Sequence, residues 1–71
     1  MPDERLRNTL KVHRAKFDLT QEQLADLVMV SRKTINTIEN GVFVPSTTLA
    51  LKLARALHTS VEGLFVLDCG K

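Results

Sequence analysis

Five polar side chains with hydrogen-bonding ends recur on one side of the segment 32–40. Arginine and lysine suit the acceptor edge of guanine, asparagine suits adenine, and threonine suits a thymine methyl group or a polar base edge. Ile35 and Ile38 mark the opposite, inward side if the segment is helical. The exposed side then consists of Arg32, Lys33, Asn36, Thr37 and Asn40. This face is predicted to read base edges in a DNA major groove.

Position along the segment separates base contacts from phosphate contacts. Residues near the start of such a helix reach deepest into the groove in the usual docking, which favours Arg32 and Lys33 for the bases. Gln21 lies in the first turn of a preceding predicted helix, beside free backbone amides that suit a phosphate oxygen. Asn40 and the Gly41 amide are candidates for a second phosphate contact. A polar face is often only a solvated surface. Whether this one is predicted to bind DNA depends on the elements that present it.

The segment 20–40 carries start and stop signals for two short helices. Thr20 with Gln23 three residues later forms a capping box, and apolar residues at staple spacing flank it. Ser31 is a favoured N-cap residue for the second helix, which should end where Asn40 is followed by Gly41. Two helices joined by a tight turn match the helix-turn-helix pattern. An exposed polar face on the second helix of such a pair favours groove reading over a bland surface.

Two residues of this segment make specific structural predictions. Ala25 is small, and we expect it where the two helices cross closely, so that a bulkier side chain would push them apart. Met29 lies in the turn, where a helix end often needs a positive φ angle. Methionine adopts that angle at a cost of order 1 kcal/mol or more, so the turn is expected to be strained.

Three further helices are predicted to pack around the pair. The first spans residues 4–17, with Leu6, Leu10, His13 and Phe17 inward and the basic residues, including Arg14, mainly off that stripe. The fourth begins at Ser46 and runs to Leu57. A last short helix opens at Ser60, with Val61, Leu64 and Phe65 inward. The acidic residues, Glu39 among them, resemble helix surface or cap positions.

Composition indicates one small globular domain spanning residues 1–71. The chain is 44% hydrophobic and 25% charged, with a formal net charge of +2, so it should fold and carries no polycationic tail. No signal peptide core and no apolar run of membrane-spanning length is present, and a cytoplasmic location is expected. Cys69 is the only cysteine, which rules out an internal disulfide and leaves an ordinary thiol in a tail.

Catalysis has little support in the sequence. There is no glycine-rich phosphate loop and no histidine pair at metal-ligand spacing. His13 is expected to be a core residue bonded to a backbone group rather than a ligand or base. We therefore expect no enzyme activity, no catalytic residue, no metal and no cofactor.

Apolar residues outside the predicted core suggest contacts with other proteins. A domain of 71 residues has a marginal core, so dimerisation would help it. Phe65, Val66 and Leu67 are the candidate dimer residues, and the tail is expected to extend the last helix or to pair as a strand with its symmetry mate. A loop of Val42, Phe43 and Val44 is a candidate surface for a protein partner.

Four sequence blocks together resemble the Xre or Cro/cI-type helix-turn-helix family of transcription regulators, over about residues 6–65. They are LTQEQLA (19–25), SRKTINTIENG (31–41), PSTTLALKLARAL (45–57) and SVEGLF (60–65). The resemblance implies an all-α, compact five-helix bundle of the lambda-repressor-like type, with or without a short C-terminal extension or strand. Members of this family usually bind palindromic operators in double-stranded DNA as dimers.

The resemblance also places functional residues. The family's base-reading positions fall on Arg32, Lys33, Asn36 and Thr37, and its phosphate contacts on Gln21, Ser31 and Asn40. Four positions depart from the family pattern. Glycine is usual at Met29, glycine or asparagine at His58, and an aliphatic residue is common at His13. At Val42, a lysine or arginine often follows the Asn-Gly pair. Losing a cation at Val42 should remove one phosphate contact and make DNA affinity less dependent on salt.

We therefore predict a sequence-specific DNA-binding transcriptional regulator, expected to be a repressor that acts as a homodimer. The alternative is a protein-interaction module, such as an antitoxin or an accessory subunit, which uses the bundle mainly to bind a partner.

Overall fold

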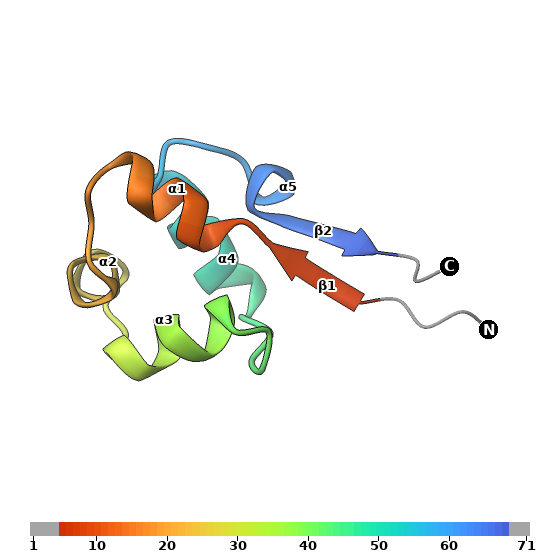
Figure 1. Cartoon of the computed structure of the whole chain (residues 1–71), viewed down its shortest axis with the longest axis horizontal. Helices are drawn as coiled ribbons and strands as arrows, with labels where there is room; N and C mark the ends of the chain where they lie inside the picture. Colours follow the sequence, from red (N-terminus) through yellow and green to blue (C-terminus); the bar gives the residue numbers. More distant parts are fainter. Residues whose placement is uncertain (1–4, 69–71) are drawn as a thin grey trace.

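The computed structural model describes residues 5–68, which form five helices and two short strands (Figure 1). In chain order they are β1 (Arg5–Asn8), α1 (Leu10–Lys16), α2 (Gln21–Val28), α3 (Arg32–Glu39), α4 (Thr47–Ala56), α5 (Val61–Leu64) and β2 (Phe65–Asp68). The helices gather at one end of the molecule, and the two strands project from them. Cys69 lies outside the described residues.

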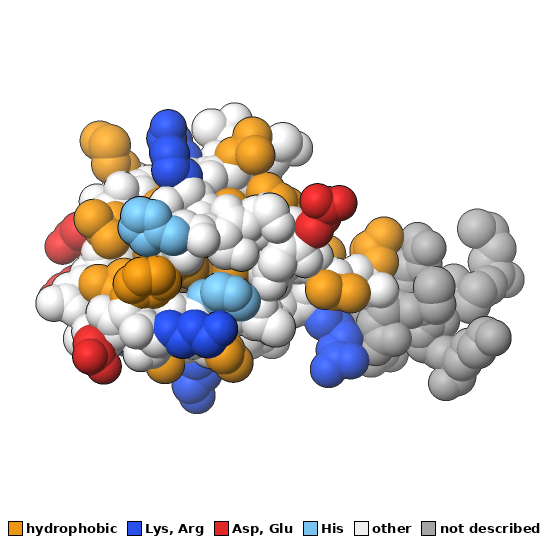
Figure 2. All heavy atoms as spheres, turned by 90° about the horizontal axis from the view of Figure 1, so that it is seen from above, with side chains coloured by type: hydrophobic (Ala, Val, Ile, Leu, Met, Phe, Trp, Pro, Cys, Tyr) orange, Lys and Arg blue, Asp and Glu red, His pale blue; other side chains and the backbone are white. Residues whose placement is uncertain are grey.

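The predicted helix over residues 4–17 is wrong at its start, because residues 5–8 form a strand. β1 pairs with β2 in an antiparallel sheet, with Leu6 opposite Leu67 and Asn8 opposite Phe65. Two segments that are far apart in sequence supply each other's backbone hydrogen bonds, and this pairing overrides the local helical pattern. Hydrophobic side chains are exposed along this two-stranded sheet (Figure 2). The predicted C-terminal strand is present, but its partner strand belongs to the same chain.

Hydrogen bonds from Asn8 and Thr9 connect the two-stranded sheet to the helices. The Asn8 side chain donates from Nδ2 to the Ile38 carbonyl oxygen at 2.9 Å and accepts the Leu10 N–H at 3.2 Å. The Thr9 N–H donates to the Leu64 carbonyl oxygen at 2.8 Å. His13 is half-buried, and its Nδ1 lies 3.0 Å from the Thr9 carbonyl oxygen. His13 thus has the expected backbone partner but is not a core residue.

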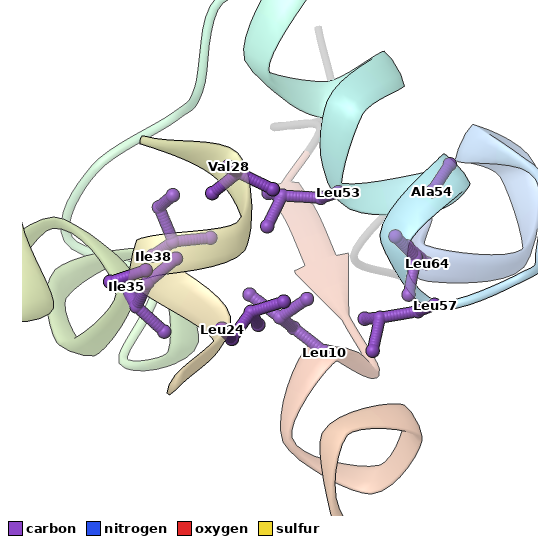
Figure 3. Close-up of a cluster of buried hydrophobic side chains, with 10 residues drawn as sticks. Leu10, Leu24, Val28, Ile35, Ile38, Leu53, Ala54, Leu57 and Leu64 are labelled. Carbon is purple, nitrogen blue, oxygen red and sulfur yellow. The ribbon is translucent and has the colours of Figure 1, made fainter. Parts of the chain in front are cut away.

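The core draws on every helix (Figure 3), and it confirms that Ile35 and Ile38 form the inward side of α3. Ala25 is 1% exposed, as a close crossing of α2 and α3 requires. The stripe predicted for the first helix is only partly right, because Leu10 is buried while Phe17 is 46% exposed. The buried cluster consists of Leu10, Leu24, Ala25, Val28, Ile35, Ile38, Leu53, Ala54, Leu57 and Leu64.

The first four helices share one way of ending. After α2, the Val30 N–H donates to the Ala25 carbonyl oxygen at 2.9 Å and the Met29 N–H donates to that of Asp26 at 3.3 Å. This pair of bonds is a Schellman motif, which needs a positive φ angle at its central residue. The corresponding residues and their φ angles are Asp18 (54°), Met29 (61°), Gly41 (75°) and His58 (54°). The positive φ angle predicted at Met29 is confirmed.

No helix between residues 5 and 68 is long and apolar enough to cross a lipid bilayer. Within the same range, no three histidine, cysteine, aspartate or glutamate side chains gather as they would around a metal ion.

Candidate nucleic-acid interface

Two capped starts hold α2 and α3 in a fixed relation. Thr20 Oγ1 accepts the Gln23 N–H at 3.0 Å while Gln23 Oε1 accepts the Thr20 N–H at 2.9 Å, which is the predicted capping box. Ser31 Oγ accepts the Thr34 N–H at 3.2 Å. The caps, the buried inner sides and the Schellman turn at Met29 together make the helix pair rigid.

The polar face of α3 points outward, as its spacing predicts. Ile35 and Ile38 are 0% and 1% exposed, so the opposite side of the helix faces solvent. Arg32, Lys33 and Asn36 are exposed, and no hydrogen bond or ion pair holds either cationic side chain within the described part of the chain. Two cations near the start of an exposed helix are therefore available to a ligand.

Thr37 and Ser31 are already engaged within α3. Thr37 is half-buried, and its hydroxyl donates to the Thr34 carbonyl oxygen at 2.9 Å. It therefore offers a methyl group and an acceptor, which suit contact with a thymine methyl. Ser31 Oγ caps the helix and also lies 3.0 Å from the Thr34 hydroxyl.

Asn40 and the following loop close the far end of α3. The Asn40 side chain is exposed, but the Gly41 N–H donates to the Ile38 carbonyl oxygen at 3.0 Å. The Gly41 amide is therefore engaged in ending the helix, and the predicted phosphate contact falls to the Asn40 side chain. In the loop, Val42, Phe43 and Val44 are 77%, 45% and 64% exposed.

An ion pair lies directly behind the polar face, and the sequence interpretation missed it. Arg14 Nε donates to Glu39 Oε2 at 2.8 Å, and the two side chains are 15% and 4% exposed. The prediction that Arg14 and Glu39 lie on helix surfaces is wrong. Each follows a buried residue by four positions, Leu10 and Ile35, so both lie on inward stripes. That spacing is the signal that could have identified them.

Gln21 joins this ion pair to the polar face. Its Nε2 donates to Glu39 Oε1 at 3.0 Å and to Asn36 Oδ1 at 3.2 Å. Arg14 also donates from Nη1 to the Leu19 carbonyl oxygen at 2.7 Å. One network thus connects α1, the start of α2 and the exposed face of α3.

Comparison with known proteins identifies the same region. A helix-turn-helix family model matches residues 10–64, from the start of α1 to the end of α5. A protein of Archaeoglobus fulgidus described as an uncharacterized HTH-type transcriptional regulator is 44% identical over 63 residues, which cover 89% of each chain.

Two solved structures share the fold. The restriction-modification controller protein C.AhdI from Aeromonas hydrophila aligns with a TM-score of 0.72 and 33% identity, over 76% of this chain and 82% of its own. The clp gene regulator ClgR from Corynebacterium glutamicum aligns with a TM-score of 0.70 and 31% identity, over 73% of this chain. This chain spans 55% of the ClgR chain, or about half its length.

Proposed function

The chain belongs to the helix-turn-helix family of DNA-binding transcriptional regulators, and we propose that it is a repressor that binds a palindromic operator as a homodimer. We treat residues 1–71 as one DNA-binding domain. The observation that carries the proposal is the exposed polar face of α3, whose opposite side is buried in the core and whose start is capped by Ser31.

Each polar residue has a role in this proposal. Arg32 and Lys33 are exposed at the start of α3 and donate to guanine edges, while Asn36 and Thr37 contact the bases one turn later. Phosphate contacts come from Ser31 and Asn40 at the two ends of α3 and from the start of α2 at Gln21.

The homodimer proposal is supported by exposed apolar side chains on β2. Val66 and Leu67 are 53% and 60% exposed, whereas Phe65 packs against the core and contributes less to any contact surface. A dimer would place two α3 helices in successive major grooves, about 34 Å apart. Light scattering should give twice the chain mass for the intact protein and a lower mass for Val66→Asp. A monomeric intact protein would exclude the dimer.

The experiment that tests the proposed function is selection of bound duplexes from a random pool. We expect an enriched motif with two-fold symmetry, whose half-sites are one helical turn apart. Binding should weaken steeply with added salt, because neutralised phosphates release counterions. Equal binding of all sequences by folded protein would contradict a sequence-specific regulator.

One observation favours the alternative, a protein-interaction module. The loop residues Val42, Phe43 and Val44 are apolar and exposed together, where they could contact a protein partner. In that case the selection should enrich no motif, and Phe43→Ser should abolish a stoichiometric complex with the partner. An enriched motif that Phe43→Ser leaves unchanged favours the regulator.

A further inference from the structure

We propose that Gln21 is a positioning residue for base recognition: it holds the Asn36 side-chain amide with its oxygen inward and its NH2 group outward. Asn36 would then present only donors to the DNA. This assignment rests on the proposed DNA-binding function and goes beyond it, because it names the kind of base edge that one residue reads.

The buried ion pair determines which atoms of the network donate hydrogen bonds and which accept them. A carboxylate only accepts hydrogen bonds and a guanidinium only donates them. Glu39 receives bonds from Arg14 Nε at 2.8 Å and from Arg14 Nη2 at 3.3 Å. The Gln21 atom that lies 3.0 Å from Glu39 Oε1 must therefore be the amide nitrogen, since an amide oxygen there would repel the carboxylate.

The same nitrogen determines the orientation of Asn36. Gln21 Nε2 carries two hydrogens; one bonds to Glu39, and the second faces the Asn36 amide at 3.2 Å. The Asn36 atom at that position must be an acceptor, which is Oδ1. Nδ2 is then directed away from Gln21. Asn36 is exposed and lies one turn after Arg32, so its donors belong to the polar face of α3.

This network changes the role expected of Gln21 itself. Both hydrogens of its Nε2 are engaged, so the side chain has no donor left for a phosphate oxygen. A phosphate contact at the start of α2 must then use backbone amides of the first turn.

A fixed donor discriminates among bases. In the major groove, guanine offers the acceptors N7 and O6, thymine offers the acceptor O4, and adenine offers the acceptor N7 beside its N6 amino donor, whereas cytosine offers the N4 amino donor and no acceptor. Asn36 with its NH2 group outward should therefore select against cytosine at the base that it faces. A freely rotating asparagine would tolerate either kind of edge.

The first test uses the free protein, so it does not depend on DNA binding. In side-chain amide NMR, the Gln21 Nε2 hydrogens should exchange with water more slowly than the Asn36 Nδ2 hydrogens, because only the former are both bonded. Glu39→Gln should accelerate exchange at Gln21. Equal exchange at the two side chains in the wild type would overturn the positioning role.

The second test measures base preference on an operator selected with the wild-type protein. Asn36→Asp preserves the acceptor toward Gln21 but turns the outward group into an acceptor, so the bases with an amino donor, cytosine and adenine, should gain over guanine and thymine at one position in each half-site. Gln21→Met removes the hydrogen bond that orients Asn36, and it should reduce discrimination between bases at that same position by about tenfold. All other positions should keep their preferences.

Asn40→Asp is the matched control, because it adds the same charge at the exposed C-cap of α3, which forms no hydrogen bond with Gln21. It should weaken binding to every sequence alike. An unchanged preference for both Asn36→Asp and Gln21→Met would overturn the proposal. A wild-type protein with slow Gln21 exchange but no base preference at any position would instead contradict the proposed function.

Discussion

At the scale of single residues, strained backbone conformations lie at the helix ends. Asp18, Met29 and His58 all adopt positive φ angles that disfavour residues with a Cβ atom. The His58 ring lies 5.5 Å from the ring of Phe17, and this contact offsets part of the strain. Met29 has no such compensation, because its side chain is 85% exposed.

We therefore expect Met29→Gly to stabilise the protein by about 0.5 to 1 kcal/mol, since relief of the positive φ angle outweighs the greater freedom of glycine in the unfolded chain. Urea unfolding measures the difference. Met29→Ala is the matched control, because it removes the long side chain but keeps the strained angle. A gain for alanine equal to that for glycine would show that exposure of the side chain, not the φ angle, is the cause.

At the scale of elements, the buried pair of Arg14 and Glu39 joins α1 to α3, and Gln21 adds α2 to the same network. The Asn8 side chain at the end of β1 donates to the Ile38 carbonyl oxygen and so joins the two-stranded sheet to the last turn of α3. α3 is thus held by polar contacts at its C-terminal half as well as by its buried isoleucines.

Removing one partner of the buried pair should destabilise the protein strongly. Arg14→Met leaves the Glu39 carboxylate without its cation, and we expect a loss of about 3 kcal/mol in the free energy of unfolding. Combining it with Glu39→Gln removes both charges and keeps an acceptor for Gln21, so most of the loss should be recovered. If Arg14→Met alone unfolds at the wild-type urea concentration, the pair does not hold the helices together.

Elements with local signals could be predicted from sequence, and those that depend on distant partners could not. Thr20, Ser31 and Ser46 cap helices at the predicted positions, because capping depends on residues within one turn. β1 was missed because its partners in β2 lie 57 to 63 positions further along the chain. The residues of the polar face were likewise predictable from period, whereas the Gln21 network required the three-dimensional crossing of α2 and α3.

At the scale of the whole molecule, the chain is mildly basic and presents a polar face on α3. The sheet of β1 and β2 projects from one end of the helical bundle (Figure 1). With a net charge of only +2, affinity for DNA depends on where the cations lie rather than on their number. Arg32 and Lys33 lie at the start of α3, and the sheet of β1 and β2 is the surface that we propose for contact with a second copy. The proposed DNA-binding and dimer surfaces therefore do not overlap.

The most direct test of base reading by α3 is the discrimination of Arg32→Ala between the selected operator and single-base variants of it. We expect a loss of about 1 to 3 kcal/mol in discrimination at one base pair of each half-site. Lys16→Ala removes the same charge from an exposed position on α1 and should leave discrimination intact. If Arg32→Ala discriminates among the variants as the wild-type protein does, Arg32 does not read the bases.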